Sequence, residues 1–401
     1  MQLVRTAGTG LTTRRRSASF WIVAGGLLSL LCGANLAATL YAVYGQRFGF
    51  SKAMLAAIFA TYTLVLVPAL LAFGQLSDRF GRRPVILAGL TTGIAGLVLF
   101  ALADSVAWLF AARAVQGLSV AMISGAAVAA LAELEPERDA LRSALVATVA
   151  LTGGTATGPL LGGILAQWAP DRLVVPYLAG IALLAVSVVT GLAIPETVAD
   201  RAGHGWRIQR PGVPREIRGA FTRVAVTGAA VWSVAALFVS VLPSYTTQIT
   251  GSSDLALLGA VSSLMLFASC ASQAVVRRGA RRSGAQAAGL GMLALGLVGL
   301  VLAAPLGAVA ALAAGAVLAG AGHGVGFLAA QHGLNQIAPE GRRGELTAAF
   351  YTCIYLGVSV SVIGVGVLAD AASLYTGLVV FAAVTGAASL LVAGWQLAVP
   401  G

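Results

Sequence analysis

The sequence predicts an all-α membrane protein whose twelve transmembrane helices form two similar bundles of six. Three features support this fold class: an apolar composition, long charge-free runs, and basic residues confined to the gaps between the runs. Hydrophobic residues make up 58% of the 401-residue chain and charged residues only 10%, whereas soluble domains carry about 25% charged residues. Because the net charge of +11 is divided among these gaps and forms no basic face with aromatic residues, a nucleic-acid partner is not expected.

Twelve apolar runs are long enough to cross a bilayer, which takes about 20 residues of helix. They are continuously apolar and do not alternate with a period of two, so helices are predicted and barrel strands are not. Nine runs contain no Asp, Glu, Lys or Arg: 17–46, 53–77, 84–103, 143–170, 173–195, 224–253, 255–276, 346–369 and 371–401. A tenth, 105–132, contains only Arg113, and the charge-free stretch 283–339 divides near Pro305 and Gly307 into two helices.

The basic residues predict which side of the membrane each gap faces, because Lys and Arg accumulate in cytoplasmic loops. With the N-terminus inside, 21 of the 25 basic residues fall in the inner segments 1–16, 78–83, 133–142, 196–223, 277–282 and 340–345. The outer loops hold only Arg47, Lys52 and Arg172. We therefore expect a multi-pass protein of the bacterial inner membrane with both termini in the cytoplasm.

The longest polar segment lies in the middle of the chain and separates two halves. We expect a cytoplasmic tail over 1–16, a six-helix bundle over 17–195, a cytoplasmic linker over 196–223 and a second six-helix bundle over 224–401. The arginines of 277–282 repeat those of 79–83 about 200 residues earlier, which suggests a duplication. Two similar halves around a site at mid-membrane are the arrangement by which secondary transporters achieve alternating access.

The loop between the second and third predicted helices carries the most informative motif. It reads GQLSDRFGRRP and resembles the signature loop of the major facilitator superfamily. The resemblance implies a latch that joins the two halves on the cytoplasmic side while the transport site faces outward. The residues that match this motif are Gly74, Asp78, Arg79, Gly81, Arg82 and Arg83. An ordinary basic loop would explain the arginines but not an aspartate between two spaced glycines.

The fifth predicted helix contains a second motif, made of Gly154, Gly158, Pro159, Gly162 and Gly163. Glycines four residues apart share one helix face and allow backbones to approach closely, and a proline bends the helix. The pattern resembles the segment that marks the antiporter branches of the superfamily, especially the twelve-helix drug:proton antiporters. The alternative is a glycine-rich packing helix without a transport role.

Candidate coupling residues are few. Arg113 and Gln116 resemble a third family segment, in which such an arginine is proposed to tune proton transfer, although helix-end carbonyls could also hold a structural charge. Drug antiporters often place a carboxylate in helix one, whereas this chain has Asn35 there, and none of its acidic residues lies near the centre of a span. His323 is the remaining embedded group with a suitable intrinsic pKa, and a structural hydrogen-bonding histidine is the competing interpretation.

Further polar and aromatic residues could line a central cavity: Asn35, Tyr41, Tyr62, Trp232, Tyr245, Tyr351 and Tyr355. Each could instead make a helix–helix hydrogen bond, and Tyr245 could belong to the aromatic belt at the membrane surface. A cavity without charged residues favours neutral or lipophilic solutes. The three cysteines, Cys32, Cys270 and Cys353, are widely separated, so neither a disulfide framework nor a metal site is expected, and no cofactor is implied.

These features together predict a secondary active transporter that works by alternating access and is not an enzyme. Resemblance favours proton-coupled efflux of drug-like or lipophilic compounds by a monomer in the lipid bilayer. Uptake or facilitated passage of a small neutral metabolite is the alternative, followed by a membrane receptor that does not transport. The sequence contains no paired carboxylates, no zinc-protease motif and no nucleophile elbow that would indicate a membrane enzyme.

Overall fold

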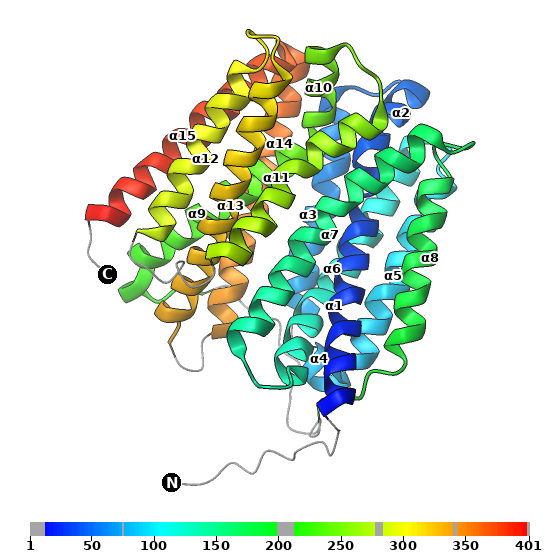
Figure 1. The fold of residues 1–401 in the computed structure, drawn as a ribbon, viewed down its shortest axis with the longest axis vertical. Helices are drawn as coiled ribbons and strands as arrows, with labels where there is room; N and C mark the ends of the chain where they lie inside the picture. Colours follow the sequence, from blue (N-terminus) through cyan, green and yellow to red (C-terminus); the bar gives the residue numbers. More distant parts are fainter. Residues whose placement is uncertain (1–12, 74–75, 199–211, 277–283, 340–342, 399–401) are drawn as a thin grey trace.

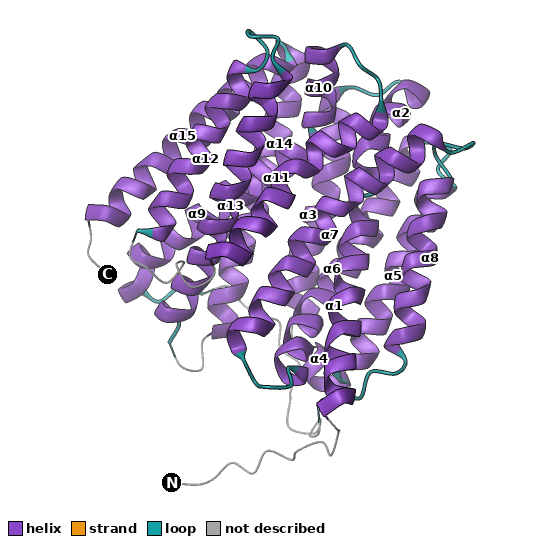
Figure 2. Ribbon diagram, viewed as in Figure 1, coloured by secondary structure: helices purple, strands orange, loops and turns teal. Residues whose placement is uncertain are grey.

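A computed structural model describes residues 13–73, 76–198, 212–276, 284–339 and 343–398. Helices make up nearly all of this part of the chain, and no strand occurs in it (Figure 2). Eleven helical spans are at least 18 residues long and apolar enough to cross a membrane, and the apolar helix Val175–Gly191 is shorter. Long spans satisfy their own backbone hydrogen bonds, as a bilayer requires. The chain is a multi-pass integral membrane protein.

The first half of the chain contains eight helices as the structure describes it. They are α1 (Thr13–Asn35), α2 (Ala37–Phe48), α3 (Lys52–Phe73), α4 (Leu76–Phe80), α5 (Arg82–Ala101), α6 (Val106–Leu134), α7 (Ala140–Trp168) and α8 (Val175–Gly191). The first predicted span corresponds to α1 and α2 together. They are separated at Leu36, whose amide donates to the Gly33 carbonyl three residues back at 3.4 Å. Leu36 itself keeps a helical backbone, with φ −53° and ψ −39°.

The second half begins with a short 3-10 turn, η1 (Arg215–Ile217). It continues through α9 (Arg218–Ser240), α10 (Leu242–Thr250), α11 (Leu255–Val276), α12 (Ala285–Leu302), α13 (Val309–Ile337), α14 (Arg343–Ala371) and α15 (Leu374–Ala398). The break expected near Pro305 lies between α12 and α13, where Gly307 adopts a positive φ of 57°. A left-handed residue ends a helix at little cost only when it is glycine.

Several helices begin earlier than the charge-free runs predicted, and the difference is largest for α1 and α9. Helix α1 begins at Thr13 and so includes three arginines of the expected tail, and α9 begins at Arg218 inside the expected linker. Arginine is a good helix former, and its long side chain can bury its stem while the guanidinium reaches water. A span predicted from the absence of charge is therefore shorter than the real helix wherever the helix continues into the polar layer of the membrane. The domain boundaries themselves stay a prediction.

The second half repeats the first, and three of its helices do so at one offset. Helices α3, α6 and α7 have 22, 29 and 29 residues, and α11, α13 and α14, which begin 203 positions later in each case, have the same lengths. A buried hydrogen bond is repeated as well: Tyr44 donates to the Phe100 carbonyl at 2.9 Å, and Tyr245 donates to the Leu300 carbonyl at 3.0 Å. The two halves are thus built to one plan.

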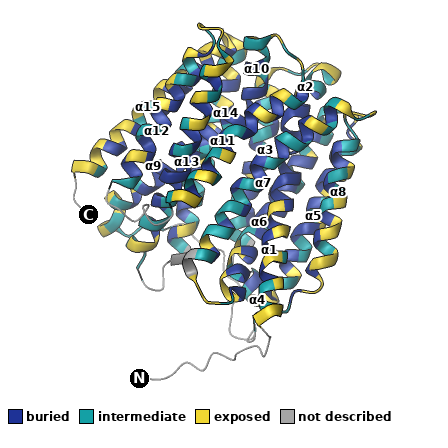
Figure 3. Cartoon of the chain, in the orientation of Figure 1, coloured by how far each residue is buried: buried dark blue, intermediate teal, exposed yellow. Residues whose placement is uncertain are grey.

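Each half has its own hydrophobic core, and two pairs of helices make most of the contacts between the halves. One buried cluster is drawn almost entirely from 20–194 and the other almost entirely from 221–393. Helix α7 packs against α11, and α3 packs against α14 (Figure 1). Figure 3 shows exposed residues along the outer helices such as α8 and α15, where large apolar side chains including Val189 and Leu391 are exposed. Such a surface suits a lipid environment.

Candidate functional site

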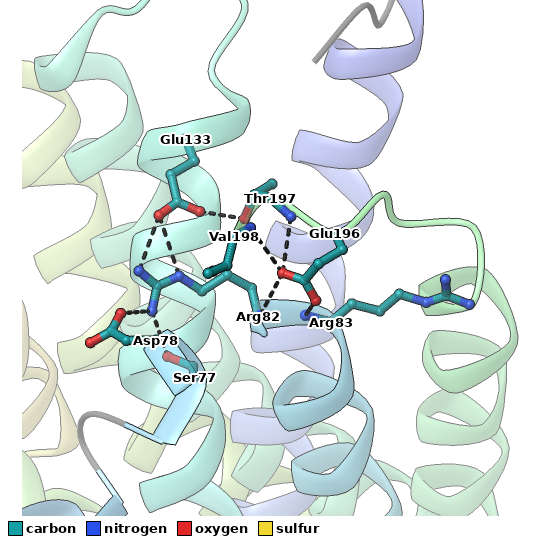
Figure 4. A network of polar contacts seen from close by, with 8 residues as sticks. All are labelled: Ser77, Asp78, Arg82, Arg83, Glu133, Glu196, Thr197 and Val198. Atoms are coloured by element: carbon teal, nitrogen blue, oxygen red, sulfur yellow. Dashed lines mark hydrogen bonds and ion pairs between the residues drawn. The ribbon is translucent and has the colours of Figure 1, made fainter. Parts of the chain in front are cut away.

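The predicted signature loop forms a polar network at the end of the molecule where α1 begins and α15 ends (Figure 4). Gly81 has a φ of +101°, which glycine alone adopts readily, and it joins α4 to α5. The Arg82 guanidinium forms an ion pair with Asp78, bonds Ser77 Oγ at 2.6 Å and contacts the Glu133 carboxylate at 3.1 Å. One arginine therefore joins α4, α5 and the end of α6.

The residues after α8 complete this network. Glu196 accepts the first two amides of α5, from Arg82 at 2.9 Å and Arg83 at 3.3 Å, which places an anion at the positive end of that helix. The Thr197 hydroxyl donates to Glu133. A Cβ at position 81 would collide with the Glu196 carboxylate. Glycine is thus required both for the turn and for this close approach.

The structure brings together only some of the predicted latch residues. Asp78, Gly81 and Arg82 meet, whereas Arg83 joins the network through its backbone and its side chain extends away (Figure 4). Arg79 is exposed and lies over the Phe80 ring at 5.6 Å. Gly74 lies outside the described residues. The contacts described for this network stay within the first half and the residues that follow α8, so a latch between the two halves remains a prediction.

Sequence reasoning missed the carboxylates that complete the network, Glu133 and Glu196. The signal that could have found them was their position: each lies in a segment predicted to be cytoplasmic and basic, next to the end of an apolar run. A carboxylate at such a place can pair with the arginines of a neighbouring loop. The sequence could not show which loops are neighbours.

Asp78→Asn should reduce transport about tenfold while leaving membrane insertion unchanged. The substitution removes the negative partner of Arg82. A hydrogen bond to a charged group contributes about 1.5–3 kcal/mol, and a loss of about 1.4 kcal/mol changes an equilibrium tenfold. Flux into proteoliposomes, normalised to the amount of inserted protein, measures the effect. Asp104→Asn is the matched control, because Asp104 is an exposed carboxylate. Unaltered flux in Asp78→Asn would contradict a role for this network in transport.

The glycines of α7 form a continuous seam with α1. A Cβ at Gly154, Gly158 or Gly162 would collide with a backbone carbonyl of α1. The three carbonyls belong to Leu28, Cys32 and Leu36, and they are spaced four apart like the glycines that face them. Gly163 faces a different neighbour, the Leu255 carbonyl of α11. This motif therefore places α7 against α1 in its own half and against α11 in the other half.

Arg113 is a buried cation of the first half, with 5% of its surface exposed. Its guanidinium lies over the rings of Phe59 and Tyr62, 4.8 and 4.7 Å from their centroids. It donates to the Ala34 carbonyl at 3.2 Å and to Gln116 Oε1 at 3.1 Å. The charge is thus held by two aromatic faces and by the carbonyl oxygen of a helix, the kind of partner expected of a structural charge.

Gln116 and Asn35 contribute to the same region. Gln116 is buried and its amide reaches toward the Gly33 carbonyl at 3.5 Å, whereas the Asn35 amide turns back to the Leu31 carbonyl of its own helix at 2.8 Å. The carbonyls at the junction of α1 and α2 are therefore contacted by side chains of α6 that the sequence singled out. Whether Arg113 and Gln116 take part in coupling stays a prediction.

His323 lies fully buried in the second half, on α13. Its Nδ1 is 2.7 Å from the Ser269 hydroxyl of α11, which also accepts the Gln273 amide at 3.1 Å. Among the described residues, Nε2 has no partner. The ring of Trp232 is 5.3 Å away, centroid to centroid, and its indole nitrogen is likewise without a partner there. Ser269 and Gln273 were not among the predicted site residues, since small polar residues in a span give little signal by themselves.

The remaining aromatic candidates divide into two groups. Tyr41 and Tyr245 are buried in the cores of their own halves, and the bond from Tyr245 to the Leu300 carbonyl assigns it to the core, not to an aromatic belt. Tyr62, Tyr351 and Tyr355 are half-buried. Tyr351 accepts the Gln331 amide at 3.2 Å and lies 6.3 Å from Tyr355, measured between ring centroids. Tyr355 also packs against the core of the first half, so this group lies nearer the junction of the two halves.

Within the residues that the structure describes, no three His, Cys, Asp or Glu side chains come close enough to hold a metal ion. The three cysteines are free and separate. Two charged side chains, Arg113 and Glu135, are fully buried in this part of the chain. Glu135 lies at the end of α6 and pairs with Arg142 at 3.0 Å.

Comparison with known proteins gives a consistent result. The sequence pattern of the Major Facilitator Superfamily matches residues 22–362. The vesicular acetylcholine transporter of Homo sapiens is 35% identical over 130 residues, covering 32% of this chain and 24% of that protein. The cephamycin export protein CmcT of Amycolatopsis lactamdurans is 33% identical over 195 residues, covering 41% of this chain and 40% of the exporter.

The fold is also that of a solved transporter. The crystal structure of the nucleoside transporter NupG superposes with a TM-score of 0.69 at 13% identity, covering 95% of this chain and 99% of that one. The chain spans less than half the length of the two relatives named above. Because the family pattern covers most of the sequence and the fold agrees with it, this chain belongs to the Major Facilitator Superfamily of membrane transporters.

Proposed function

We propose that this transporter exports small uncharged or lipophilic compounds in exchange for protons. The observation that carries the proposal is the seam of Gly154, Gly158 and Gly162 against the carbonyls of α1. Its motif resembles that of the antiporter branches, and here it makes a continuous backbone contact. The relative named as a cephamycin exporter supports the same direction of transport.

The proposed substrate class follows from the charges of the described spans. Arg113 is already held by two aromatic rings, a carbonyl and Gln116, and Glu135 is paired with Arg142. The charge of Glu135 is therefore neutralised, whereas the Nε of Arg113 has no hydrogen-bond partner among the described residues. Apolar and aromatic surfaces with a few hydrogen-bonding groups suit a largely uncharged solute.

The proposed direction assigns the network of Asp78 and Arg82 to the cytoplasmic side. The network lies in segments that the sequence predicts to be cytoplasmic, and those segments together contain 21 of the 25 basic residues. Export then means that a solute enters from the end where the network lies and leaves at the opposite end.

Proton coupling is assigned to His323. Its Nδ1 is engaged by Ser269, so Nε2 is the ring nitrogen left to take up or release a proton. The rings of Trp232 and Phe327 pack against the imidazole, with centroids 5.3 and 6.0 Å away. The exchanged proton is therefore placed on Nε2 of His323.

A pH gradient imposed on proteoliposomes tests the proposal. Efflux of a lipophilic dye should be driven by the gradient in the wild type and should lose this dependence in His323→Asn. His332→Asn is the matched control, because His332 lies on the same helix and is half-buried. Transport that continues unchanged when the gradient is collapsed would remove proton exchange and leave facilitated passage as the function.

A further inference from the structure

We propose that the end of the molecule opposite the Asp78 network is held closed by two equivalent helix caps, each made by a side chain of one half on a helix of the other half. The proposal goes beyond the proposed function: it depends on alternating access, which the family implies, and not on the substrate or on protons. We call this end the far end; α3 and α11 begin there and α7 and α14 end there (Figure 1).

The first cap joins α14 to α3. Asp370, at the end of α14, accepts the first two amides of α3, from Lys52 at 3.0 Å and from Ala53 at 2.8 Å. The next amide, of Met54, is satisfied locally by Ser51 Oγ at 3.2 Å. The first amides of a helix have no partner within the helix, and a carboxylate there also interacts with the positive end of the helix dipole.

The second cap joins α7 to α11. Gln167, at the end of α7, accepts the first amide of α11, from Leu255, at 2.9 Å. The next two amides, of Ala256 and Leu257, are satisfied locally by Asp254 Oδ1 at 2.8 and 3.1 Å. Each helix thus receives one cap from its own preceding loop and one from the opposite half of the protein.

The two caps occupy equivalent positions in the repeat. The capped residues Lys52 and Leu255 are 203 positions apart, and so are the capping residues Gln167 and Asp370. Two glycines that contact the capped residues are also 203 positions apart. Gly163 of α7 lies against the Leu255 carbonyl, and Gly366 of α14 lies against the Lys52 carbonyl. A contact that recurs at the same offset in both halves is a property of the architecture and not an accident of one loop.

Little space remains between the halves where these contacts lie. A pocket between α3 and α14, lined in part by Lys52, Ala56, Ser244 and Gly366, has a cavity volume of about 20 Å³, which holds about one water molecule. The described contacts therefore close the far end. Opening it would separate α3 from α14 and α7 from α11, and both caps would have to break.

The two caps should differ in strength. Asp370 brings a full negative charge and two acceptor contacts to the start of α3, whereas Gln167 brings a neutral carbonyl and one contact to α11. Hydrogen bonds to charged groups contribute about twice as much as neutral ones. Asp370 is therefore the main positioning residue of the closed far end, and Gln167 supports it.

Pulsed EPR distances across the far end test this inference without transport or substrate. Spin labels are placed at Gln46 of α2 and Ala372 after α14, both exposed, in a chain whose three cysteines are replaced. Asp370→Ala should raise the ratio of long to short distances about tenfold. Gln167→Ala should raise it less, and the double variant should raise it most.

Two comparisons separate a cross-half cap from a general loss of helix capping. Asp254→Ala weakens the local cap of α11 and should leave the distances unchanged. Asp370→Asn keeps an acceptor oxygen without the charge and should give an intermediate ratio. Unchanged distances in Asp370→Ala, or an equal shift in Asp254→Ala, would overturn the inference, whereas loss of pH-driven transport alone would not.

Discussion

Replacing Gly154, Gly158 and Gly162 together by alanine is expected to destabilise the protein and to abolish transport. Each new Cβ would collide with a backbone carbonyl, at Leu28 or Cys32 of α1 or at Leu36 just after it, and overpacking of a close contact costs about 1–3 kcal/mol per site. Because the obstacle is backbone, no side chain can move aside to relieve it. Thermal unfolding of the purified protein should show a clearly lower midpoint, and dye efflux should fall to the level of empty vesicles.

A second triple variant, with the same three glycine-to-alanine changes at uncrowded positions, serves as the control. Gly25, Gly291 and Gly394 lie in helices where an added Cβ would meet nothing within 4 Å, so alanine there should be tolerated. Alanine is favoured over glycine in a helix by about 1 kcal/mol per site, and the control should unfold at the same temperature or higher. If both triple variants behaved alike, the seam between α7 and α1 would not be the source of the effect.

Arg113→Leu should reduce flux about a hundredfold while leaving the unfolding midpoint nearly unchanged. The guanidinium makes two hydrogen bonds, to Ala34 and Gln116, and two bonds to a charged donor contribute at least roughly 3 kcal/mol, which corresponds to about two factors of ten. Removing a buried charge also removes its desolvation cost, so stability need not fall. Flux and thermal unfolding measured on the same preparation decide the outcome.

Two further variants sharpen this prediction. Arg113→Lys keeps the charge but not the planar group that stacks between Phe59 and Tyr62, so partial flux is expected. Arg47→Leu is the control, since Arg47 is an exposed arginine that lies over one ring, at 5.5 Å. A midpoint that falls in parallel with flux in Arg113→Leu would assign the arginine a structural role only.

The sequence was sufficient for the fold because a bilayer imposes a simple rule on it. Charge-free runs of about 20 residues located the spans, and the break near Pro305 was placed correctly between α12 and α13. The rule failed at α1 and α9, where arginines continue the helix beyond the apolar run. It also could not show that the first span is interrupted at Leu36.

The candidate site was less predictable, because its residues are defined by their partners. Asp78 and Arg82 were identified from a motif, but the carboxylates that complete their network, Glu133 and Glu196, lie about 50 and 115 residues away along the chain. Likewise, Asp370 and Gln167 are ordinary residues at the ends of helices until the structure places them on amides of the opposite half. Pairing across such separations depends on the arrangement of the helices.

The interruption at Leu36 divides the first span into two parts with different neighbours. Helix α1 packs against α5, α6, α7 and α8 of its own bundle, whereas α2 also contacts α9, α10 and α11 of the other. The helix contacts of α1 thus stay within one bundle, while those of α2 reach across to the other. A rearrangement between the two bundles would therefore act on the contacts of α2 and leave the packing of α1 in its own bundle intact.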